Sequence, residues 1–445
     1  MRVTRREFLA QGCAVGAATL ALQRFGLINA LAQVGGYRAL VCIFLFGGND
    51  SNNMIVPLDD YAAYNAVRGS STGVNIARDT LLSIAPPRAG STFGLHPSLA
   101  ALLPLWNARR LAAVCNVGPL VEPLTRDRYL AGNARIPLNL FSHSDQQAQW
   151  QTCVSTGPSA TGWGGRTADR LGSTVTFPTM VTVAGLTPFT ASLSSQALAL
   201  TPGQPFKLNG FNTTKPSQAR YDALAALLQQ DPGQPLVAAA NRATSLAVAN
   251  SQLLSTLPAL STAFPATSLG NELQQVAQLI KLNQSAIALP RQLFFCSLGG
   301  FDTHNTQATT HANLLTQLAD AMAAFYQATL ELGVADAVTT FTLSDFARTL
   351  GPNGNSGTDH AWGGHHLVMG GAVKGGDFYG TYPVLAPNGP DDTDAGAGAR
   401  GRWIPTTAVD QYAATLASWY GVAGGDLVAV FPNLDRFATP TLNFV

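Results

Sequence analysis

The chain carries unusually little charge. Only 11% of its 445 residues are charged, and 26 basic side chains nearly cancel 25 acidic ones, for a formal net charge of +1. A globular domain usually has about 25% charged residues, so Ser, Thr, Asn, Gln, Gly and Ala must supply much of this surface. The lack of a Lys/Arg run disfavours nucleic-acid binding and attraction to an anionic membrane. A hydrophobic content of 46% can still bury a core, which argues against a disordered chain.

Long hydrophobic runs are also missing, which argues against a permanent membrane span. The N-terminus instead reads TRREFL at residues 4–9, followed by a short apolar stretch at about residues 12–22 and by ALA at residues 30–32. This pattern is typical of a twin-arginine export signal. We therefore expect residues 1–32 to be a signal peptide recognised by the twin-arginine translocase, and residues 33–445 to be a periplasmic or secreted protein. Substrates of this route cross the membrane already folded, often with a metal or cofactor, so a metal-dependent protein is expected.

Cysteine is scarce, and no C-x-x-C pair occurs, so a zinc ribbon and a dithiol redox site are excluded. One of the five cysteines, Cys13, lies in the signal segment. Of the other four, three lie in apolar runs and behave there as small hydrophobic residues. We expect all four to be buried free thiols: Cys42, Cys115, Cys153 and Cys296.

The arrangement of apolar runs predicts a doubly wound, mostly parallel α/β sheet. Continuous rather than alternating apolarity indicates strands covered on both faces. Predicted strands lie at residues 39–46, 111–117, 293–298, 338–343 and 367–370, and predicted helices at 97–110, 308–332 and 409–420. Residues 155–290 are richer in Ser, Thr and Gln, with a β-like part at 179–200 and helical parts at 218–230 and 235–285. We interpret them as an insertion or cap within one domain spanning residues 33–445.

Acidic residues follow three of the predicted strands: Asp50, Asp302 and Asp345. Ligands in an open parallel sheet bind beyond the carboxyl ends of its strands, so these side chains should meet at one edge. Four of the seven histidines also lie in segments after strands, among them His304 and His360. Carboxylate and imidazole together suit zinc, manganese or iron better than calcium, and in extended backbone Asp302 and His304 point the same way. The alternative is that these aspartates only form turns or cap helices.

A serine in the segment FSHSDQQ, residues 141–147, is a candidate nucleophile. Ser142 precedes a predicted helix, whose N-terminal N–H groups can hold an oxyanion or a phosphate. Alternatively, Ser144 and Gln147 form a capping box, which explains a serine without catalysis. His96 begins the helix at residues 97–110 and either joins the site or caps that helix. Because no G-x-S-x-G motif occurs, a standard α/β-hydrolase esterase is disfavoured.

Several motifs together resemble the domain of unknown function 1501 family over nearly the whole mature chain. Besides the twin-arginine start, they are FGGND (46–50), LHPSL (95–99), SH (142–143), GGFDTH (299–304), SDFART (344–349), GTDHAWGG (357–364), VMGGAVKGG (368–376), VDQYAATLASWYGV (409–422) and VFPNL (430–434). That family in turn resembles the alkaline phosphatase and sulfatase superfamily, whose doubly wound sheet holds one or two metals at its strand ends.

The resemblance assigns roles to individual residues. It implies that Asp50 is the metal ligand after the first strand and that Ser142 is the nucleophile. It also implies that Asp302 and His304 bind one metal, that Asp345 supplies the carboxylate of another, and that His360 is the late histidine ligand. The chain departs from the superfamily pattern where Phe346, rather than histidine, follows Asp345, and where one residue separates Asp302 from His304. Arg348 is then a candidate to bind an anion in place of a second metal.

Two hypotheses of different classes follow. The first is an exported hydrolase of phosphate or sulfate esters that uses a divalent metal, most simply zinc, with manganese or iron as alternatives. Its substrate would be a small-molecule or glycan ester. The second is a non-catalytic exported protein that uses the same scaffold for binding or envelope assembly, because a fold does not by itself fix a function. A metal-dependent esterase or peptidase is a further alternative. Convergence of the predicted ligands in space separates the first hypothesis from the second.

Overall fold

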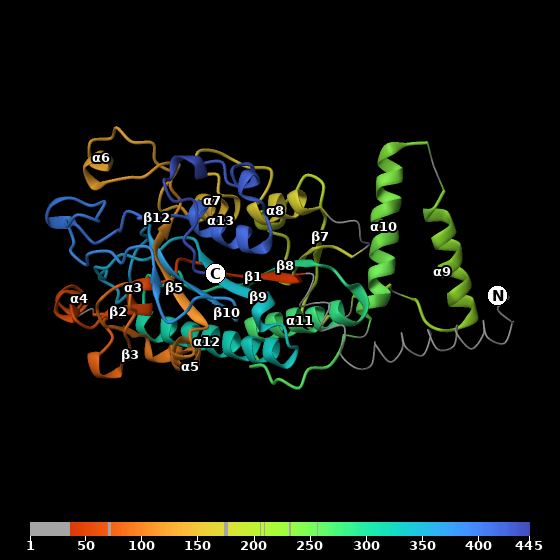
Figure 1. Ribbon diagram of the computed structural model, residues 1–445, viewed down its shortest axis with the longest axis horizontal. Helices are drawn as coiled ribbons and strands as arrows, with labels where there is room; N and C mark the ends of the chain where they lie inside the picture. Colours follow the sequence, from red (N-terminus) through yellow and green to blue (C-terminus); the bar gives the residue numbers. More distant parts are fainter. Residues whose placement is uncertain are drawn as a thin grey trace, which may run out of the picture.

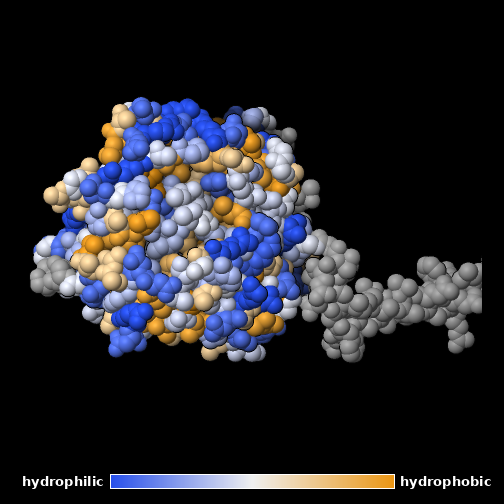
Figure 2. Space-filling model, turned by 60° about the vertical axis from the view of Figure 1, so that its left-hand side comes forward, coloured by the Kyte–Doolittle hydropathy of each residue, from blue (hydrophilic) through white to orange (hydrophobic). Residues whose placement is uncertain are grey.

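A computed structural model describes residues 36–69, 73–172, 177–204, 206–208, 210–230, 233–255 and 257–445. The signal peptide predicted for residues 1–32 lies outside the described residues. Within the part of the chain that the structure describes, no helix is both long and apolar enough to cross a membrane. Figure 2 shows polar and apolar residues interspersed over one face of the molecule.

Nine strands of the described residues form one large sheet, in the order β11-β5-β10-β9-β1-β8-β6-β7, with β12 also paired to β5. Their bounds are β1 Arg38–Leu45, β5 Leu111–Gly118, β6 Met180–Thr182, β7 Ala197–Ala199, β8 Arg291–Leu298, β9 Val338–Ser344, β10 Gly364–Gly370, β11 Phe378–Tyr379 and β12 Thr407–Ala408. The central strand β1 is parallel to β8 and β9, as the continuous apolar runs predict. A small antiparallel sheet contains β2 Ile55–Pro57, β4 Phe93–Leu95 and β3 Leu82–Ile84.

Helices cover both faces of the large sheet (Figure 1). Alternate residues of β1 belong to two different hydrophobic clusters, one on each face. One cluster includes side chains of α5 (Leu103–Asn107), α11 (Ser268–Leu282) and α12 (Gln307–Glu331). The other includes side chains of α7 (His143–Thr152), α8 (Trp163–Leu171), α13 (Val409–Tyr420) and α14 (Leu427–Val430). This three-layer α/β/α arrangement confirms the predicted fold class.

The remaining helices lie at the ends of the molecule. Near the small sheet are α3 (Ser51–Met54) and α4 (Tyr61–Arg68), and α6 (Arg126–Leu130) lies in the loop that follows β5. At the opposite end, α9 (Lys215–Leu228) and α10 (Pro235–Leu254) stand side by side beyond β7 (Figure 1). The segment at residues 155–290 thus has parts in two places. Its strands β6 and β7 continue the large sheet beside β8, whereas its helices α9 and α10 lie beyond that sheet.

One local prediction differs from the structure, and one strand runs against the prevailing direction of the mostly parallel sheet. The helix predicted at residues 97–110 is a 3-10 turn, Pro97–Leu102, followed by the short helix α5. Leu99 has a non-helical backbone conformation, and Pro104, which has no N–H to donate, begins a new helix instead of continuing one. The strand β10 runs antiparallel to β9 and β5. Residues 345–363 contain no helix, and a parallel return generally needs such a crossover.

All four cysteines of the described residues are buried free thiols, as predicted. Three of them lie in the strands β1, β5 and β8, and Cys153 ends helix α7 in a left-handed backbone conformation.

Candidate metal centre

The carboxyl ends of β1, β8 and β9 lie in register, because Leu45 pairs with both Leu298 and Ser344. The chain turns after β1 at Gly47, which has a φ of +113° and lies against the backbone of Asp302. A Cβ atom at this position would overlap that backbone, so the turn requires glycine. Three distant segments are thereby brought to one edge of the sheet.

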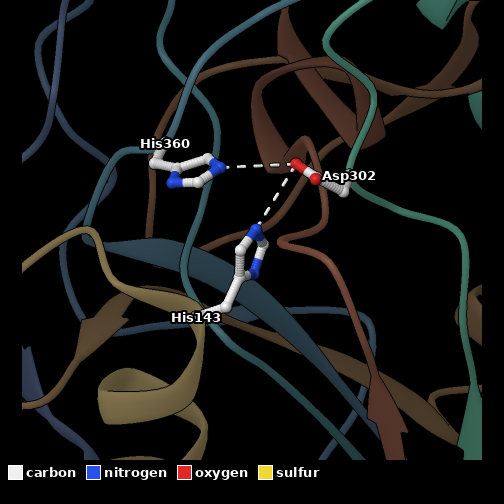
Figure 3. Close-up of side chains that lie close together, drawn as sticks. All are labelled: His143, Asp302 and His360. Atoms are coloured by element: carbon white, nitrogen blue, oxygen red, sulfur yellow. Dashed lines mark hydrogen bonds and ion pairs between the residues drawn. The ribbon is translucent and has the colours of Figure 1, made fainter.

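Beyond this edge, the side chains of His143, Asp302 and His360 converge (Figure 3). Each offers one potential ligand atom, and these atoms all lie within 4.8 Å of one another. The distances from Asp302 Oδ1 are 3.5 Å to His143 Nε2 and 3.3 Å to His360 Nε2. His304 adjoins this set, with its Nε2 3.1 Å from Asp302 Oδ1 and 3.0 Å from His360 Nε2. We call these four residues the histidine cluster.

The other ring nitrogen of each histidine in the cluster has a hydrogen-bond acceptor of its own. Nδ1 of His143 lies 2.6 Å from Asp345 Oδ2, Nδ1 of His304 lies 3.0 Å from Asp359 Oδ1, and Nδ1 of His360 lies 2.7 Å from the carbonyl oxygen of Phe141. An acceptor at Nδ1 favours the tautomer that carries its proton there and leaves the lone pair on Nε2. All three imidazoles therefore present Nε2 toward Asp302.

Arg348 is buried and forms an ion pair with the carboxylate of Asp302. Its guanidinium NH1 lies 2.9 Å from Asp302 Oδ1 and 3.3 Å from the carbonyl oxygen of Gly47, and its NH2 donates to the carbonyl oxygen of Thr358. The side chain of Arg348 is fully buried, whereas that of Asp302 is 47% exposed. Burial raises the pKa of the Asp302 carboxyl, but the hydrogen bond and charge of Arg348 outweigh it and bring that pKa below its ordinary value.

Two histidines of the cluster are shifted in opposite directions. The hydrogen bond to Asp345 raises the pKa of His143, and together with the smaller contributions from the charges of Asp345 and Asp302 it outweighs desolvation, which lowers that pKa. Burial is the main cause that lowers the pKa of His360, and the positive charge of Arg348 lowers it further. His360 is therefore the more readily available of the two as a neutral imidazole near pH 7.

Asp50 and Asp345 were expected as metal ligands, but the structure gives each of them other partners. Asp50 is fully buried and accepts two hydrogen bonds from Arg68, at 2.6 and 2.9 Å, and one from Gln307. Burial raises the pKa of the Asp50 carboxyl, but the charge and hydrogen bonds of Arg68 reverse this effect and lower it. Asp345 is also fully buried, and its carboxylate faces the donors of His143, Gln147 and the Gly47 backbone.

Ser142 lies beside the cluster. It is the N-cap residue of α7, but its hydroxyl makes no capping bond; it donates to Asp145 Oδ2 at 2.6 Å and lies 3.2 Å from Ser144 Oγ. The neighbouring residues on both sides contact the cluster, through the Phe141 carbonyl and the His143 ring. The capping box expected between Ser144 and Gln147 does not form, because the Gln147 amide donates to Asp345 instead.

His96 lies elsewhere. It is buried, and its Nδ1 accepts a hydrogen bond from the Ser98 N–H, so it caps the turn at Pro97–Leu102. Burial lowers the pKa of His96 to about 3.

Sequence reasoning missed His143, Gln147 and Asp359. His143 directly follows the candidate nucleophile Ser142 in the sequence, and this adjacency was the available signal. Gln147 was explained by a capping box, and Asp359 directly precedes His360 in the GTDHAWGG motif. Their roles depend on which side chains of three separate segments face each other.

The cluster has the chemistry that a divalent metal requires. Zinc binds histidine nitrogen at about 2.0–2.1 Å, so two ligand atoms of one tetrahedral ion lie roughly 3.3 Å apart, close to the separations from Asp302 Oδ1. His143 Nε2 is a buried nitrogen that makes no hydrogen bond with the described residues. Two imidazoles and one carboxylate also leave a position open, as in catalytic zinc sites. These residues therefore fit a single zinc, manganese or iron ion.

The fold and the cluster together define the class: an α/β protein with a metal-type histidine cluster at the carboxyl edge of its sheet. The family model described as "Protein of unknown function (DUF1501)" matches residues 37–393. The chain belongs to this family. A search of curated protein sequences finds no match to the chain.

Solved structures resemble the chain only distantly. Lipoteichoic acid synthase LtaP from Listeria monocytogenes is 7% identical, with a TM-score of 0.33 over 89% of this chain and 75% of that one. The PsFucS1 sulfatase from Pseudoalteromonas sp. is 8% identical, with a TM-score of 0.32 over 95% and 74%. The phosphonate monoester hydrolase of Agrobacterium radiobacter is 9% identical, with a TM-score of 0.35 over 87% and 74%. Likenesses at this level do not identify a substrate.

Proposed function

We propose that this protein is an exported, metal-dependent hydrolase of phosphate or sulfate esters. The observation that carries the proposal is the convergence of His143, Asp302 and His360 at the carboxyl ends of parallel strands. A metal bound there would polarise an ester oxygen and neutralise developing negative charge. Arg348 is buried and neutralises Asp302, which reduces the repulsion that this carboxylate would exert on an anionic substrate.

The chain's own residues supply the remaining functions. We place the nucleophile at Ser142, whose hydroxyl donates to the Asp145 carboxylate and whose neighbours on both sides contact the cluster. The Ser142 proton passes to the Asp145 carboxylate as the serine oxygen attacks phosphorus or sulfur, and the bond to the leaving oxygen on the opposite side breaks. The departing alkoxide takes up a proton, and water then hydrolyses the esterified serine to release phosphate or sulfate and restore the hydroxyl. His304 contacts Asp359 through Nδ1 and lies near Asp302 through Nε2, and in its imidazolium form it would donate the Nε2 proton to the leaving oxygen.

The experiment is a turnover assay of metal-loaded protein with p-nitrophenyl phosphate, p-nitrophenyl sulfate and bis-p-nitrophenyl phosphate. We expect one substrate class to be hydrolysed, and turnover to fall at least about 100-fold in His360→Ala. Ser142→Ala tests the nucleophile, because full retention of activity would assign attack to water instead. Absence of turnover on all three esters, with metal bound, would contradict the proposed activity.

A second function is favoured by one specific contact. Arg348 already neutralises Asp302, so this carboxylate has a positively charged partner within the protein. A purely structural or binding role would use the same contact. A non-catalytic exported module on the same scaffold therefore predicts a folded protein that hydrolyses none of these esters, with or without metal. The same assay separates the two functions.

Export by the twin-arginine route is part of the proposal and depends on residues 1–32. In a host with a functional translocase, a reporter protein fused to the natural residues 1–32 should reach the periplasm or the medium. The same fusion with Arg5→Lys and Arg6→Lys should remain in the cytoplasm. Equal export of both fusions would contradict this route.

A further inference from the structure

Asp345 is enclosed by donors that belong to the protein. Its Oδ1 accepts the backbone N–H of Gly47 at 3.2 Å, and its Oδ2 lies 2.6 Å from His143 Nδ1 and accepts the Gln147 amide at 2.7 Å. The carboxylate is fully buried at the end of β9. A carboxylate surrounded in this way is fixed in position and is directed at the histidine.

We propose that Asp345 is a positioning residue that makes His143 a metal ligand, and that it does not bind the metal itself. The inference rests on the proposed metal-dependent function. Because Asp345 accepts the Nδ1 proton, His143 keeps its lone pair on Nε2, which is buried, makes no hydrogen bond with the described residues and lies 3.5 Å from Asp302 Oδ1. Carboxylates that orient metal-bound histidines in this way also increase the basicity of the ligand.

The packing around Asp345 supports the same assignment. The ring of Phe346, the next residue, lies 4.8 Å from the His143 ring and 4.6 Å from the His360 ring, centroid to centroid. The two histidine rings are themselves 4.4 Å apart in an edge-on arrangement. An apolar ring therefore packs against both ligand rings next to Asp345. This contact fixes the ring planes and adds no ligand of its own.

Helix α7 is the element that makes this role possible. His143 begins the helix and Gln147 lies one turn later, so both side chains leave the same face. Both contact the same carboxylate oxygen, Asp345 Oδ2. Asp345 thus joins the N-terminus of α7 to the end of β9 and sets the position of the His143 ring relative to Asp302.

The test measures Zn²⁺ affinity of the mature protein by competition with a chelating indicator. Asp345→Ala should lower the affinity roughly 10- to 100-fold, the usual effect of losing an orienting partner. Asp345→Asn should retain more of the affinity than Asp345→Ala, because its amide oxygen can still accept the Nδ1 proton of His143, while its amide nitrogen takes the place of Oδ1 beside the Gly47 N–H. A direct ligand would behave differently, since asparagine would lose the affinity as fully as alanine does.

A double-mutant cycle with His143→Ala gives the second criterion. If Asp345 acts only through His143, then Asp345→Ala causes no further loss of Zn²⁺ affinity in the His143→Ala background. Independent losses that multiply would overturn the proposal. If Asp345→Ala does not fold, Asp345→Asn replaces it in both the wild-type and the His143→Ala backgrounds, since asparagine preserves the side-chain volume of aspartate.

The control is Asp336→Asn, an exposed carboxylate just before β9, at the opposite end of the same strand. It should bind Zn²⁺ like the wild type. Failure of the wild type to bind Zn²⁺ would overturn both the ligand role of His143 and the metal-dependent function. Zn²⁺ binding with an additive cycle would overturn the positioning role alone.

Discussion

At the scale of single residues, acidic side chains that end neighbouring strands have different roles. Asp302 is half exposed and faces three imidazoles, whereas Asp50 is buried against Arg68 and Asp345 against His143 and Gln147. All three follow a predicted strand, and the sequence pattern does not distinguish them. The difference arises from partners such as Arg68 and Gln307, which lie 18 and 257 residues from Asp50 in the sequence.

Asp50 should be a stability residue. Asp50→Ala leaves the buried guanidinium of Arg68 without its carboxylate, and breaking a buried ion pair in this way costs about 3–5 kcal/mol of unfolding free energy. Urea unfolding measures this loss. The folded fraction should still bind metal with nearly wild-type affinity. Complete loss of metal from a protein of unchanged stability would show that Asp50 is a ligand after all.

At the scale of elements, turns and loops determine the site more than the strands do. The apolar runs predicted the central strands β1, β8 and β9 within one or two residues, because such strands need continuous apolar sequence. The sequence placed Asp302, His304 and His360 in segments after strands, and the structure brings their side chains together. It did not predict that α7 would contribute His143, since that requires knowing how the loop after β5 returns over the sheet.

The turn after β1 gives a prediction at this scale. Gly47→Ala adds a Cβ that overlaps the backbone of Asp302, in a backbone conformation that L-residues rarely adopt. We expect Asp302 to shift and Zn²⁺ affinity to fall by at least about tenfold, since ligand positions must hold within a few tenths of an ångström. Competition with a chelating indicator measures this loss.

Gly90→Ala is the matched control. Gly90 also has a positive φ, of +64°, but a Cβ there meets open space. This variant should lose only about 1 kcal/mol of stability from backbone strain and keep its metal affinity. Equal loss of metal in both variants would mean that strain, and not contact with Asp302, explains the effect.

At the scale of the whole molecule, the buried titratable groups predict sensitivity to acid. Burial lowers the pKa of four histidines, to about 3 for His96, His365 and His366 and to about 4 for His311. Below about pH 6.5 the unfolded chain binds protons at these positions that the folded chain does not, so stability falls as the pH falls. Two buried acids, Glu272 and Asp410, have pKa values raised by burial to about 7 and act in the opposite direction.

Four histidines outweigh two acids, so the free energy of unfolding should fall by about 2–3 kcal/mol per pH unit between pH 6.5 and pH 4.5. Urea titrations at several pH values measure this slope. His366→Phe removes one of the four groups and should flatten the slope by about 1.4 kcal/mol per pH unit. Stability that is constant or rises on acidification would contradict the account.

The central claim is that the histidine cluster is a metal centre, and elemental analysis tests it most directly. The full chain should be expressed and purified from a host with a functional twin-arginine translocase, alongside His143→Ala, His360→Ala and Asp336→Asn. We predict about one equivalent of zinc, manganese or iron in the wild type and in Asp336→Asn, and little in either histidine variant. No metal in the folded wild type, or equal metal in all four proteins, would contradict the claim.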